Sequence, residues 1–335
     1  MIRIGVMGLG MMGVTHLDAY AKCKGGVVVA VSDKIPERLH GQQKAAGNVA
    51  GQAQGAFDMS QTRKYTEGMD LINDAEVDVI DICLPTHLHL DYALATLKAG
   101  KHLLIEKPLA RTYADARRLA DAADKAKGIA MTAMCLRFWP GWTHLKDAVE
   151  KQTYGKCLAV HFRRVASHPG GAFYSNGDLS GGAALDLHIH DTDFAHYLFG
   201  VPKSVYTAAY SKVTNQPDHL ITHYRYDNGP MVTAEGCWCM SAGFPFKMQF
   251  TANFERATLI YDFPSDNPLT AVENGKAAPV KLEAGMGYDF EVAYFLDCVK
   301  SARRPDRVTM QQAADTIRIV EAEVKSGRSG QVVIL

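Results

Sequence analysis

Residues 1–135 alternate between short apolar segments and longer amphipathic ones. The apolar segments are rich in Val and Ile and hydrophobic on both faces, which is typical of strands buried in a parallel sheet. We predict such strands at Ile2–Met7, Val27–Ser32, Val77–Leu84, His102–Ile105 and Ile129–Met134. The intervening segments predict helices at Met12–Lys24, Pro36–Ala46, His87–Ala99 and Tyr113–Lys127. Strand and helix in alternation predict an α/β domain with a doubly wound parallel sheet.

The pattern changes in the second half of the chain, where longer strand-like segments follow one another. After a helix at Trp142–Lys151, we predict strands at Cys157–Val165, Ser204–Val213, Leu220–Tyr226, Met231–Met240, Lys247–Asn253 and Ala257–Asp262. Asn228-Gly229 between two of them is a hairpin signal. Helices are predicted at Ala184–Phe199, Phe290–Ser301 and Met310–Lys325. This half therefore predicts an α+β domain with an open, mostly antiparallel sheet.

Length and composition agree with two globular domains. The chain has 335 residues, and domains average about 150 residues, so we expect one domain at 1–136 and a second at 137–335, with the closing helices free to pack back on the first. Lys plus Arg and Asp plus Glu both number 36, giving a formal net charge of zero. A nucleic-acid binder usually carries a basic excess, so we expect no nucleic-acid partner.

The cysteines and the apolar runs bear on the compartment. Seven cysteines are scattered among apolar residues, which predicts free thiols in a reducing compartment. No run of about 18 apolar residues occurs, so no membrane span is expected. Glycines interrupt the apolar segment at residues 4–14, unlike a signal-peptide core. We therefore expect a cytoplasmic protein.

A glycine-rich motif follows the first predicted strand. Gly8-Leu9-Gly10-Met11-Met12-Gly13 fits G-x-G-x-x-G and opens a predicted helix. Glycines there let the backbone approach a pyrophosphate, whose charge the helix N-terminus favours. Asp33 ends the second predicted strand, 20 residues after Gly13. An acid at this place accepts hydrogen bonds from ribose hydroxyls and repels a 2′-phosphate, which favours NAD over NADP, although Lys34 and Arg38 could soften that preference. The alternative is a tight turn that binds no ligand.

Two further groups of residues suggest chemistry. Glu106-Lys107-Pro108 follows the fourth predicted strand, and residues just past strand ends line the ligand crevice of such sheets. Asp186 and His190 are four residues apart and would share one helix face, where a carboxylate and an imidazole can form an acid–base pair. Lys107 could equally be a surface residue in a turn, and the Asp–His pair a structural one. The stretch also contains His188 and Asp191, but these would point away from that pair, so we expect no metal site.

Together these features resemble the Gfo/Idh/MocA oxidoreductases, the group of glucose-fructose oxidoreductase and inositol dehydrogenase. The resemblance covers essentially the whole chain and rests on the order of several short motifs. They are the glycine loop, Ser32-Asp33, Leu84-Pro85-Thr86 with His89, Ala99-Gly100-Lys101-His102 before Glu106-Lys107-Pro108, Arg137-Phe138, and Gly181-Gly182 with Asp186 and His190. One departure is Ala183, where the family often has a third glycine.

The resemblance implies a Rossmann domain that binds NAD, and it assigns cofactor contacts. These fall on Gly8, Gly10, Met11, Met12, Asp33, Leu84, Pro85, Thr86, His89, Glu106 and Lys107. The bond between Lys107 and Pro108 would often be cis. The second domain would form dimers or tetramers through the outer face of its sheet.

The resemblance also implies the reaction, an NAD-dependent oxidation of a secondary hydroxyl on a sugar, a polyol or a sugar derivative. His190 would be the general base, Lys107 would stabilise the developing alkoxide, and Asp186 would orient the substrate or the imidazole. Further candidates for substrate contacts are Arg137, Trp139, His168, Tyr174, Asn176 and Tyr288. The polar, glycine-rich segment 168–180 could be a loop over the site.

Other activities remain open at this stage. One is transient redox chemistry on a nucleotide sugar or glycoside, with tightly bound NAD and little net NADH. Another is a cofactor-binding sensor without catalysis, which would have no need for all of Lys107, Asp186 and His190. A metal-dependent hydrolase is a further alternative, which loss of activity with a chelator would reveal.

Overall fold

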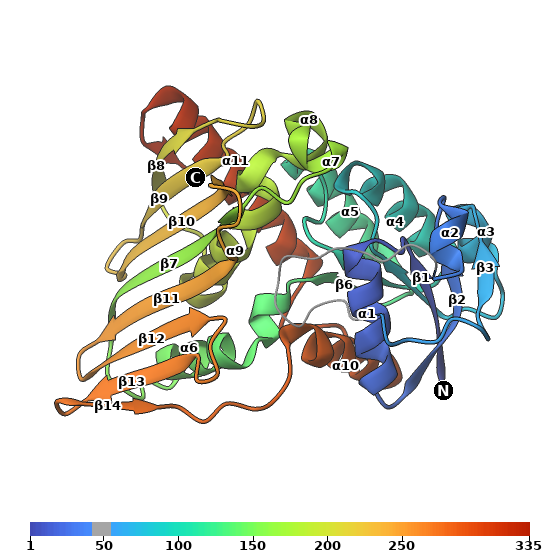
Figure 1. Cartoon of the computed structure of the whole chain (residues 1–335), viewed down its shortest axis with the longest axis horizontal. Coiled ribbons are helices and arrows are strands. Elements are labelled where there is room, and N and C mark those ends of the chain that lie inside the picture. Colours follow the sequence, from blue (N-terminus) through green and yellow to red (C-terminus); the bar gives the residue numbers. More distant parts are fainter. Residues whose placement is uncertain (42–54) are drawn as a thin grey trace. The chain divides into compact units, whose positions relative to one another are not determined.

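The computed structural model describes residues 1–41 and 55–335. They form two compact units, each described separately below (Figure 1). Unit 1 consists of Met1–Cys135 and Met286–Ala314, and unit 2 of Leu136–Gly285 and Asp315–Leu335. The last long helix, α11 (Met310–Ser329), begins in unit 1 and continues in unit 2.

Unit 1 contains a parallel sheet of six strands in the order β3-β2-β1-β4-β5-β6. The strands are β1 (Ile2–Met7), β2 (Gly26–Ser32), β3 (Arg63–Tyr65), β4 (Val79–Ile82), β5 (His102–Glu106) and β6 (Ala130–Ala133). Every neighbouring pair is parallel. The predicted doubly wound sheet is thereby confirmed. Its strand order reverses direction at β1, and such a switch point is where open α/β sheets bind ligands.

Helices accompany this sheet, and they differ from the predicted ones mainly in length. They are α1 (Met11–Lys22), α2 (Pro36–Leu39), α3 (Gly68–Asn73), a 3₁₀ turn at Thr86–Leu88, α4 (His89–Lys98), α5 (Tyr113–Lys125) and α10 (Gly287–Lys300). The predicted helix Pro36–Ala46 is seen only as α2, and residues 42–46 lie outside the described residues. The predictions missed β3 and α3. Helix α10 contacts α1, where the Lys22 ammonium pairs with Asp289 at 2.9 Å.

Unit 2 contains a sheet of nine strands in the order β14-β13-β12-β11-β7-β10-β9-β8-β15 (Figure 1). The strands are β7 (Cys157–Ser167), β8 (Ser204–Tyr210), β9 (His219–Arg225), β10 (Met231–Met240), β11 (Lys247–Phe254), β12 (Ala257–Phe263), β13 (Leu269–Glu273), β14 (Lys276–Pro279) and β15 (Val333–Ile334). The central pair β7–β10 is parallel, and the other pairs are antiparallel. The predicted mostly antiparallel sheet is confirmed, although β13, β14 and β15 were not predicted.

The inner face of this sheet packs on helices through an aromatic core. The remaining helices of unit 2 are α6 (Pro140–Glu150), α7 (Ala172–Ser175), α8 (Gly177–Ser180), a π-helical turn at Ala184–His188 and α9 (Ile189–Phe199). A short 3₁₀ segment, Cys135–Phe138, precedes α6. Trp142 of α6 is fully buried, and its ring stacks on Phe162 of β7 at 5.4 Å and meets Phe194 of α9 edge-on at 4.8 Å. Such aromatic burial dominates core energetics and fixes the helices on the sheet.

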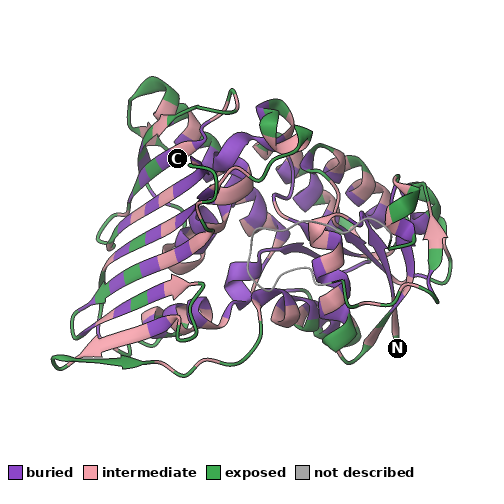
Figure 2. Ribbon diagram, in the orientation of Figure 1, coloured by how far each residue is buried: buried purple, intermediate pink, exposed green. Residues whose placement is uncertain are grey.

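The outer face of the same sheet is exposed, and its side chains alternate with buried ones along strands such as β8, β9 and β11 (Figure 2). One cross-strand row on this face consists of Tyr206, His223, Thr233, His161, Thr251 and Ile260. In the adjacent row, Arg163 donates to Glu235 at 2.9 Å and to Gln249 at 3.0 Å. The face is therefore polar at its centre, with apolar side chains such as Tyr206, Ile221 and Met231 beyond it.

Among the described residues, no helix is both long and apolar enough to cross a membrane. All seven cysteines are free thiols.

Candidate active site

The glycine loop of unit 1 joins β1 to α1 in a conformation that only glycine allows. Gly8 has a φ of +92°, and a side chain there would collide with the carbonyl oxygen of Cys83. A Cβ at Gly13 would lie 1.8 Å from the Gly8 carbonyl oxygen. By contrast, a Cβ at Gly10, the N-cap of α1, would meet nothing within 4 Å among the described residues. The loop is therefore tightly packed on the protein side and open at the helix N-terminus, where a pyrophosphate would bind.

Asp33 lies directly beside this loop. Its Oδ2 accepts a hydrogen bond from the backbone nitrogen of Leu9 at 2.7 Å, and its Oδ1 accepts one from Ile35 at 2.8 Å. Each carboxylate oxygen has a second lone pair with which to accept a ribose hydroxyl. The Arg38 guanidinium lies 3.5 Å from the same carboxylate. The loop, the open helix end and this acid together fit a dinucleotide.

His89, in the segment that follows β4, contacts the Glu106-Lys107-Pro108 turn that follows β5. His89 is buried, and its ring lies between two backbone oxygens, with Nδ1 2.8 Å from Pro108 O and Nε2 2.8 Å from Leu84 O. Burial lowers the pKa of His89, while the hydrogen bonds to the two carbonyls act in the opposite direction. Thr86 is buried beside it, whereas Pro85 is exposed. His89 therefore connects two turns rather than presenting its nitrogens to a ligand.

The Glu106-Lys107-Pro108 turn stands at the carboxyl end of β5. The bond between Lys107 and Pro108 is cis, as the resemblance implied. Glu106 is buried, and its Oε2 accepts the backbone N–H of Lys107 at 3.1 Å, while its Oε1 lies 3.1 Å from Nε2 of His16. Lys107 is half-buried. The turn is therefore held by side chains from α1 and α4 at the same edge of the sheet as the glycine loop.

In unit 2, Asp186 and His190, the predicted acid–base pair, lie on a segment that begins as a π-helix and continues as an α-helix. The predicted helix Ala184–Phe199 consists of a π-helical turn, Ala184–His188, which contains Asp186, and of α9, which contains His190. Asp186 and His190 are both half-buried, whereas His188 between them is fully buried. π-Helical turns are rare and often occur at functional sites.

The other acids of this stretch have structural partners. Asp191 accepts from Nε of Arg164 at 2.8 Å, and Asp193 accepts from Nε of Arg137 at 2.8 Å. Both pairs are buried. Because Arg137 is 0 % exposed and its guanidinium makes a second bond to Asp193 at 2.7 Å, its position favours an ion pair inside unit 2 over the expected substrate contact.

The remaining substrate-contact candidates lie in different surroundings. Trp139 is buried and meets Phe263 edge-on at 5.6 Å, so its position also favours packing. His168 and Tyr174 both contact the Trp238 ring, at 5.3 and 6.0 Å between centroids. Asn176 is exposed, and its side chain caps α8 by accepting from Asp178 N at 3.0 Å. The expected loop 168–180 thus contains two short helices.

Tyr288, the last candidate, belongs to unit 1. It is nearly buried in α10. Within unit 2, the structure brings His168 and Tyr174 together around Trp238.

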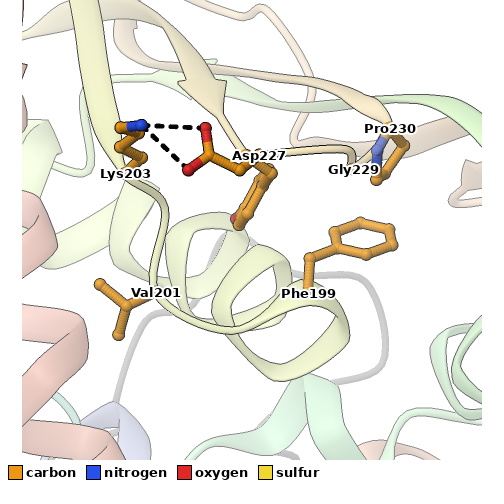
Figure 3. Close-up of a pocket in the computed structure, with 7 residues that line it drawn as sticks. Phe199, Val201, Lys203, Asp227, Gly229 and Pro230 are labelled. Atoms are coloured by element: carbon orange, nitrogen blue, oxygen red, sulfur yellow. Dashed lines mark hydrogen bonds and ion pairs between the residues drawn. The ribbon is translucent and has the colours of Figure 1, made fainter.

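An open pocket of about 360 Å³ lies in unit 2, but it contains none of these residues (Figure 3). Its lining comes from the end of α9 and from the β9–β10 turn: Phe199, Val201, Lys203, Tyr226, Asp227, Gly229 and Pro230. Lys203 and Asp227 pair with each other at 2.9 Å at the edge of the pocket.

Sequence reasoning missed a buried polar cluster below the glycine loop. His16 of α1 bonds Asp81 of β4 at 2.8 Å, and the Tyr20 hydroxyl donates to the same carboxylate at 2.9 Å. The signal was present in the sequence, because Asp81 is a single acid inside the apolar strand Val79–Ile82. Such an acid must have buried polar partners.

A parallel sheet with the glycine loop at residues 8–13 and with Asp33 beside it defines a dinucleotide-binding protein. Comparison with known families extends that conclusion. Residues 2–134 match the model described as "Oxidoreductase family, NAD-binding Rossmann fold", and residues 142–260 match the "GFO/IDH/MocA C-terminal domain". The chain belongs to the Gfo/Idh/MocA family of oxidoreductases, as the resemblance indicated.

Curated relatives include inositol dehydrogenases. Myo-inositol 2-dehydrogenase of Thermotoga maritima is 33% identical over 200 residues, which cover 59% of this chain and 55% of the relative. Inositol 2-dehydrogenase of Salmonella typhimurium is 32% identical over 201 residues, covering 59% and 54%. The chain thus matches little more than half the length of these relatives. Among solved structures, levoglucosan dehydrogenase in complex with NADH and levoglucosan has a TM-score of 0.85 at 19% identity, covering 99% of each chain, which is a likeness of fold.

Proposed function

We propose that this chain is an NAD-dependent dehydrogenase that oxidises a secondary hydroxyl of a sugar, an inositol-like polyol or a sugar derivative. The observation that carries the proposal is the place of Glu106-Lys107-Pro108. This turn follows β5, two strands from β1 and its glycine loop, at the same carboxyl edge of the sheet. A cation near a dinucleotide cradle suits the stabilisation of an alkoxide. The inositol dehydrogenases among the relatives support the substrate class.

In the proposed reaction, each half of the chain contributes polar groups. NAD, when bound, supplies the hydride acceptor. His190 removes the hydroxyl proton, because imidazole, with an ordinary pKa of about 6.5, exchanges protons near neutral pH. Lys107 donates a hydrogen bond to the same oxygen as negative charge develops on it. Asp186, two residues before the buried His188, orients the substrate or the imidazole.

The proposed cofactor contacts follow the geometry of unit 1. Gly8, Gly10, Met11 and Met12 would lie along the pyrophosphate, at the open N-terminus of α1. Asp33 would accept the ribose hydroxyls, which favours NAD because its charge repels a 2′-phosphate. Arg38 at 3.5 Å weakens that repulsion in part. The turns around Leu84–Thr86 and Glu106 would line the path to the nicotinamide.

We further propose that two or four copies associate through the outer face of the unit 2 sheet. Exposed apolar side chains at Tyr206, Ile221 and Met231 support this, and Met231 is 74% exposed. The proposed setting is the cytoplasm, since seven free cysteines suit a reducing compartment.

The experiment that tests the function mixes purified protein with NAD or, separately, NADP and a panel of inositols, hexoses, pentoses and their derivatives. Absorbance of reduced nicotinamide reports turnover. Signal with NAD and one polyol or sugar supports the proposal, and a stronger signal with NADP contradicts the role given to Asp33. Silence across the panel with NAD found bound would replace net oxidation by transient redox chemistry. Silence without NAD binding would overturn the assignment altogether.

A further inference from the structure

The cluster below the glycine loop is an ionisable group of side chains that the proposed chemistry does not use. His16, on the second turn of α1, lies between two acids from neighbouring strands. Its Nδ1 is 2.8 Å from Oδ2 of Asp81 in β4, and its Nε2 is 3.1 Å from Oε1 of Glu106 at the end of β5. The side chains of His16 and Asp81 are completely buried, and that of Glu106 is 7% exposed.

The two acids on either side of the ring favour a protonated His16. A neutral imidazole has one N–H, so it can donate to only one of the two acids, whereas the imidazolium donates to both. Burial by itself lowers the pKa of His16, but the charge of Asp81 beside it and the hydrogen bond to that carboxylate outweigh this and raise the pKa of His16 well above its usual value. Tyr20 and Cys83 also face Asp81, at 2.9 and 3.6 Å. These contacts make Asp81 the acceptor at the centre of the cluster.

Glu106, the second acid, connects His16 to the Glu106-Lys107-Pro108 turn. Glu106 uses its other oxygen, Oε2, to accept the backbone N–H of Lys107 at 3.1 Å. On the far side of the turn, the His89 ring lies 2.8 Å from the Pro108 carbonyl oxygen. The backbone of Lys107 is therefore connected through one carboxylate to a side chain of α1, the helix that starts at the phosphate-binding loop.

We propose that His16, as an imidazolium that bridges Asp81 and Glu106, is a positioning residue that fixes the Glu106-Lys107 turn relative to the glycine-loop helix. This inference rests on the proposed function, because Lys107 is the residue to be positioned. The bridge gives the cofactor cradle and the Lys107 backbone a common rigid support. Misplacing a reacting group by about 1 Å can cost on the order of a hundredfold in rate.

Two substitutions of His16 test its contact with Asp81 and its contact with Glu106 separately. His16→Asn places an amide near the position of Nδ1 and keeps a donor toward Asp81, but it does not reach Glu106. His16→Gln places its amide near the position of Nε2 and keeps a donor toward Glu106. Both replace an imidazole by a neutral amide in the same buried site, so each controls for the other in folding, which thermal unfolding will check.

The kinetic result expected is a split between the two variants. His16→Asn should lower kcat about tenfold or more, with the Kd for NAD changed less than about threefold, because the pyrophosphate and ribose contacts remain. His16→Gln should recover most of kcat. Equal losses of kcat in both variants, or an unchanged kcat in His16→Asn, would overturn the positioning role.

A spectroscopic readout does not depend on turnover. In ¹⁵N-labelled wild-type protein without substrate, both His16 ring nitrogens should carry protons, and both resonances should vanish in His16→Asn. Glu106→Gln should perturb the Nε2–H resonance more than the Nδ1–H resonance. A single protonated ring nitrogen would overturn the bridge. Absence of turnover in the wild type would instead contradict the proposed function, while these spectra still decide the protonation of His16.

Discussion

The carboxylate of Asp33 accepts a hydrogen bond of 2.7 Å from the backbone nitrogen of Leu9, in the middle of the glycine loop. The acid proposed to bind the ribose therefore also fixes the loop proposed to bind the pyrophosphate. Two parts of the cofactor site that are 24 residues apart in the chain thus depend on one side chain.

Removing the charge of Asp33 should change cofactor preference. In Asp33→Asn, the ratio of kcat/KM for NADP to that for NAD should rise about tenfold or more, which corresponds to about 1.4 kcal/mol. The reason is that repulsion of the 2′-phosphate disappears, while Arg38 remains nearby. NAD itself should bind more weakly, since the substitution alters the carboxylate that accepts the hydrogen bond from Leu9 in the glycine loop. Glu37→Gln, an exposed acid four residues further on, is the control, and an unchanged ratio in Asp33→Asn would refute the assignment.

Lys107 and His190 should be needed for turnover and not for cofactor binding. Lys107→Met and His190→Asn should each lower kcat by about two orders of magnitude or more, because each removes a group that acts on the reacting oxygen. The Kd for NAD, measured by titration, should stay within about threefold. Lys98→Met, at an exposed lysine on α4, should have no effect. Normal turnover in either site variant would eliminate the role given to that residue.

The buried pair of Arg137 and Asp193 should matter for stability. Asp193→Asn leaves the guanidinium of Arg137 buried beside a neutral partner, and breaking a buried pair in this way costs about 3–5 kcal/mol. Denaturant unfolding should show this loss. Asp227→Asn breaks the exposed pair with Lys203 (Figure 3) and should change stability by less than about 1 kcal/mol. Comparable effects of the two substitutions would contradict the structural role of Arg137.

The fold itself could be predicted well from the sequence, and the reasons are local. Segments such as Ile2–Met7 are apolar on both faces, which is a clear signal for buried parallel strands. The strands β3 and β14 escaped prediction because they are short and contain no run of large apolar residues: β3 reads Arg-Lys-Tyr, and β14 reads Lys-Ala-Ala-Pro and is exposed along its length. Their pairing is decided by neighbouring strands rather than by their own composition.

Residues of the candidate site could be predicted only where they belong to a recognisable sequence motif. Gly8, Asp33 and Lys107 lie at ends of strands that the pattern located. The buried ion pair of Arg137, which we expected as a substrate contact, could not be predicted, because its partner Asp193 is 56 residues away in sequence and only the folded chain brings them together. His16 was overlooked for the same reason, since its two acids come from separate strands.

Association through the open sheet of unit 2 should depend on its apolar side chains. Ile221→Glu combined with Tyr206→Glu introduces charge on two adjacent strands of that face and should shift the protein to monomers in analytical ultracentrifugation. Met69→Glu, an exposed methionine on α3 of unit 1, is the matched control. A monomeric wild type, or a double variant that remains associated, would exclude this face as the interface.

The pH dependence of stability should reveal the charge of His16. Its folded-state pKa is raised well above the value of about 6.5 expected in the unfolded chain. Its protonation therefore stabilises the fold fully below that unfolded value, and the contribution is lost as pH rises through the folded-state pKa. The difference in free energy of unfolding between wild type and His16→Asn should narrow from pH 6 to pH 9. The titratable groups around His16 are Asp81, Glu106 and Cys83, which contact its ring, and Tyr20, which donates to Asp81. A difference in the free energy of unfolding that is constant or widens would show a neutral imidazole.

In the proposed function, hydride passes from a carbon that bears a hydroxyl group to the nicotinamide. The most direct test incubates the protein with NAD and a mixture of inositols and hexoses that carry deuterium on carbon, and then determines the mass of the recovered cofactor. Direct hydride transfer predicts reduced nicotinamide that carries one deuterium, and none with Lys107→Met. Cofactor recovered without deuterium, from protein that binds NAD, would contradict it.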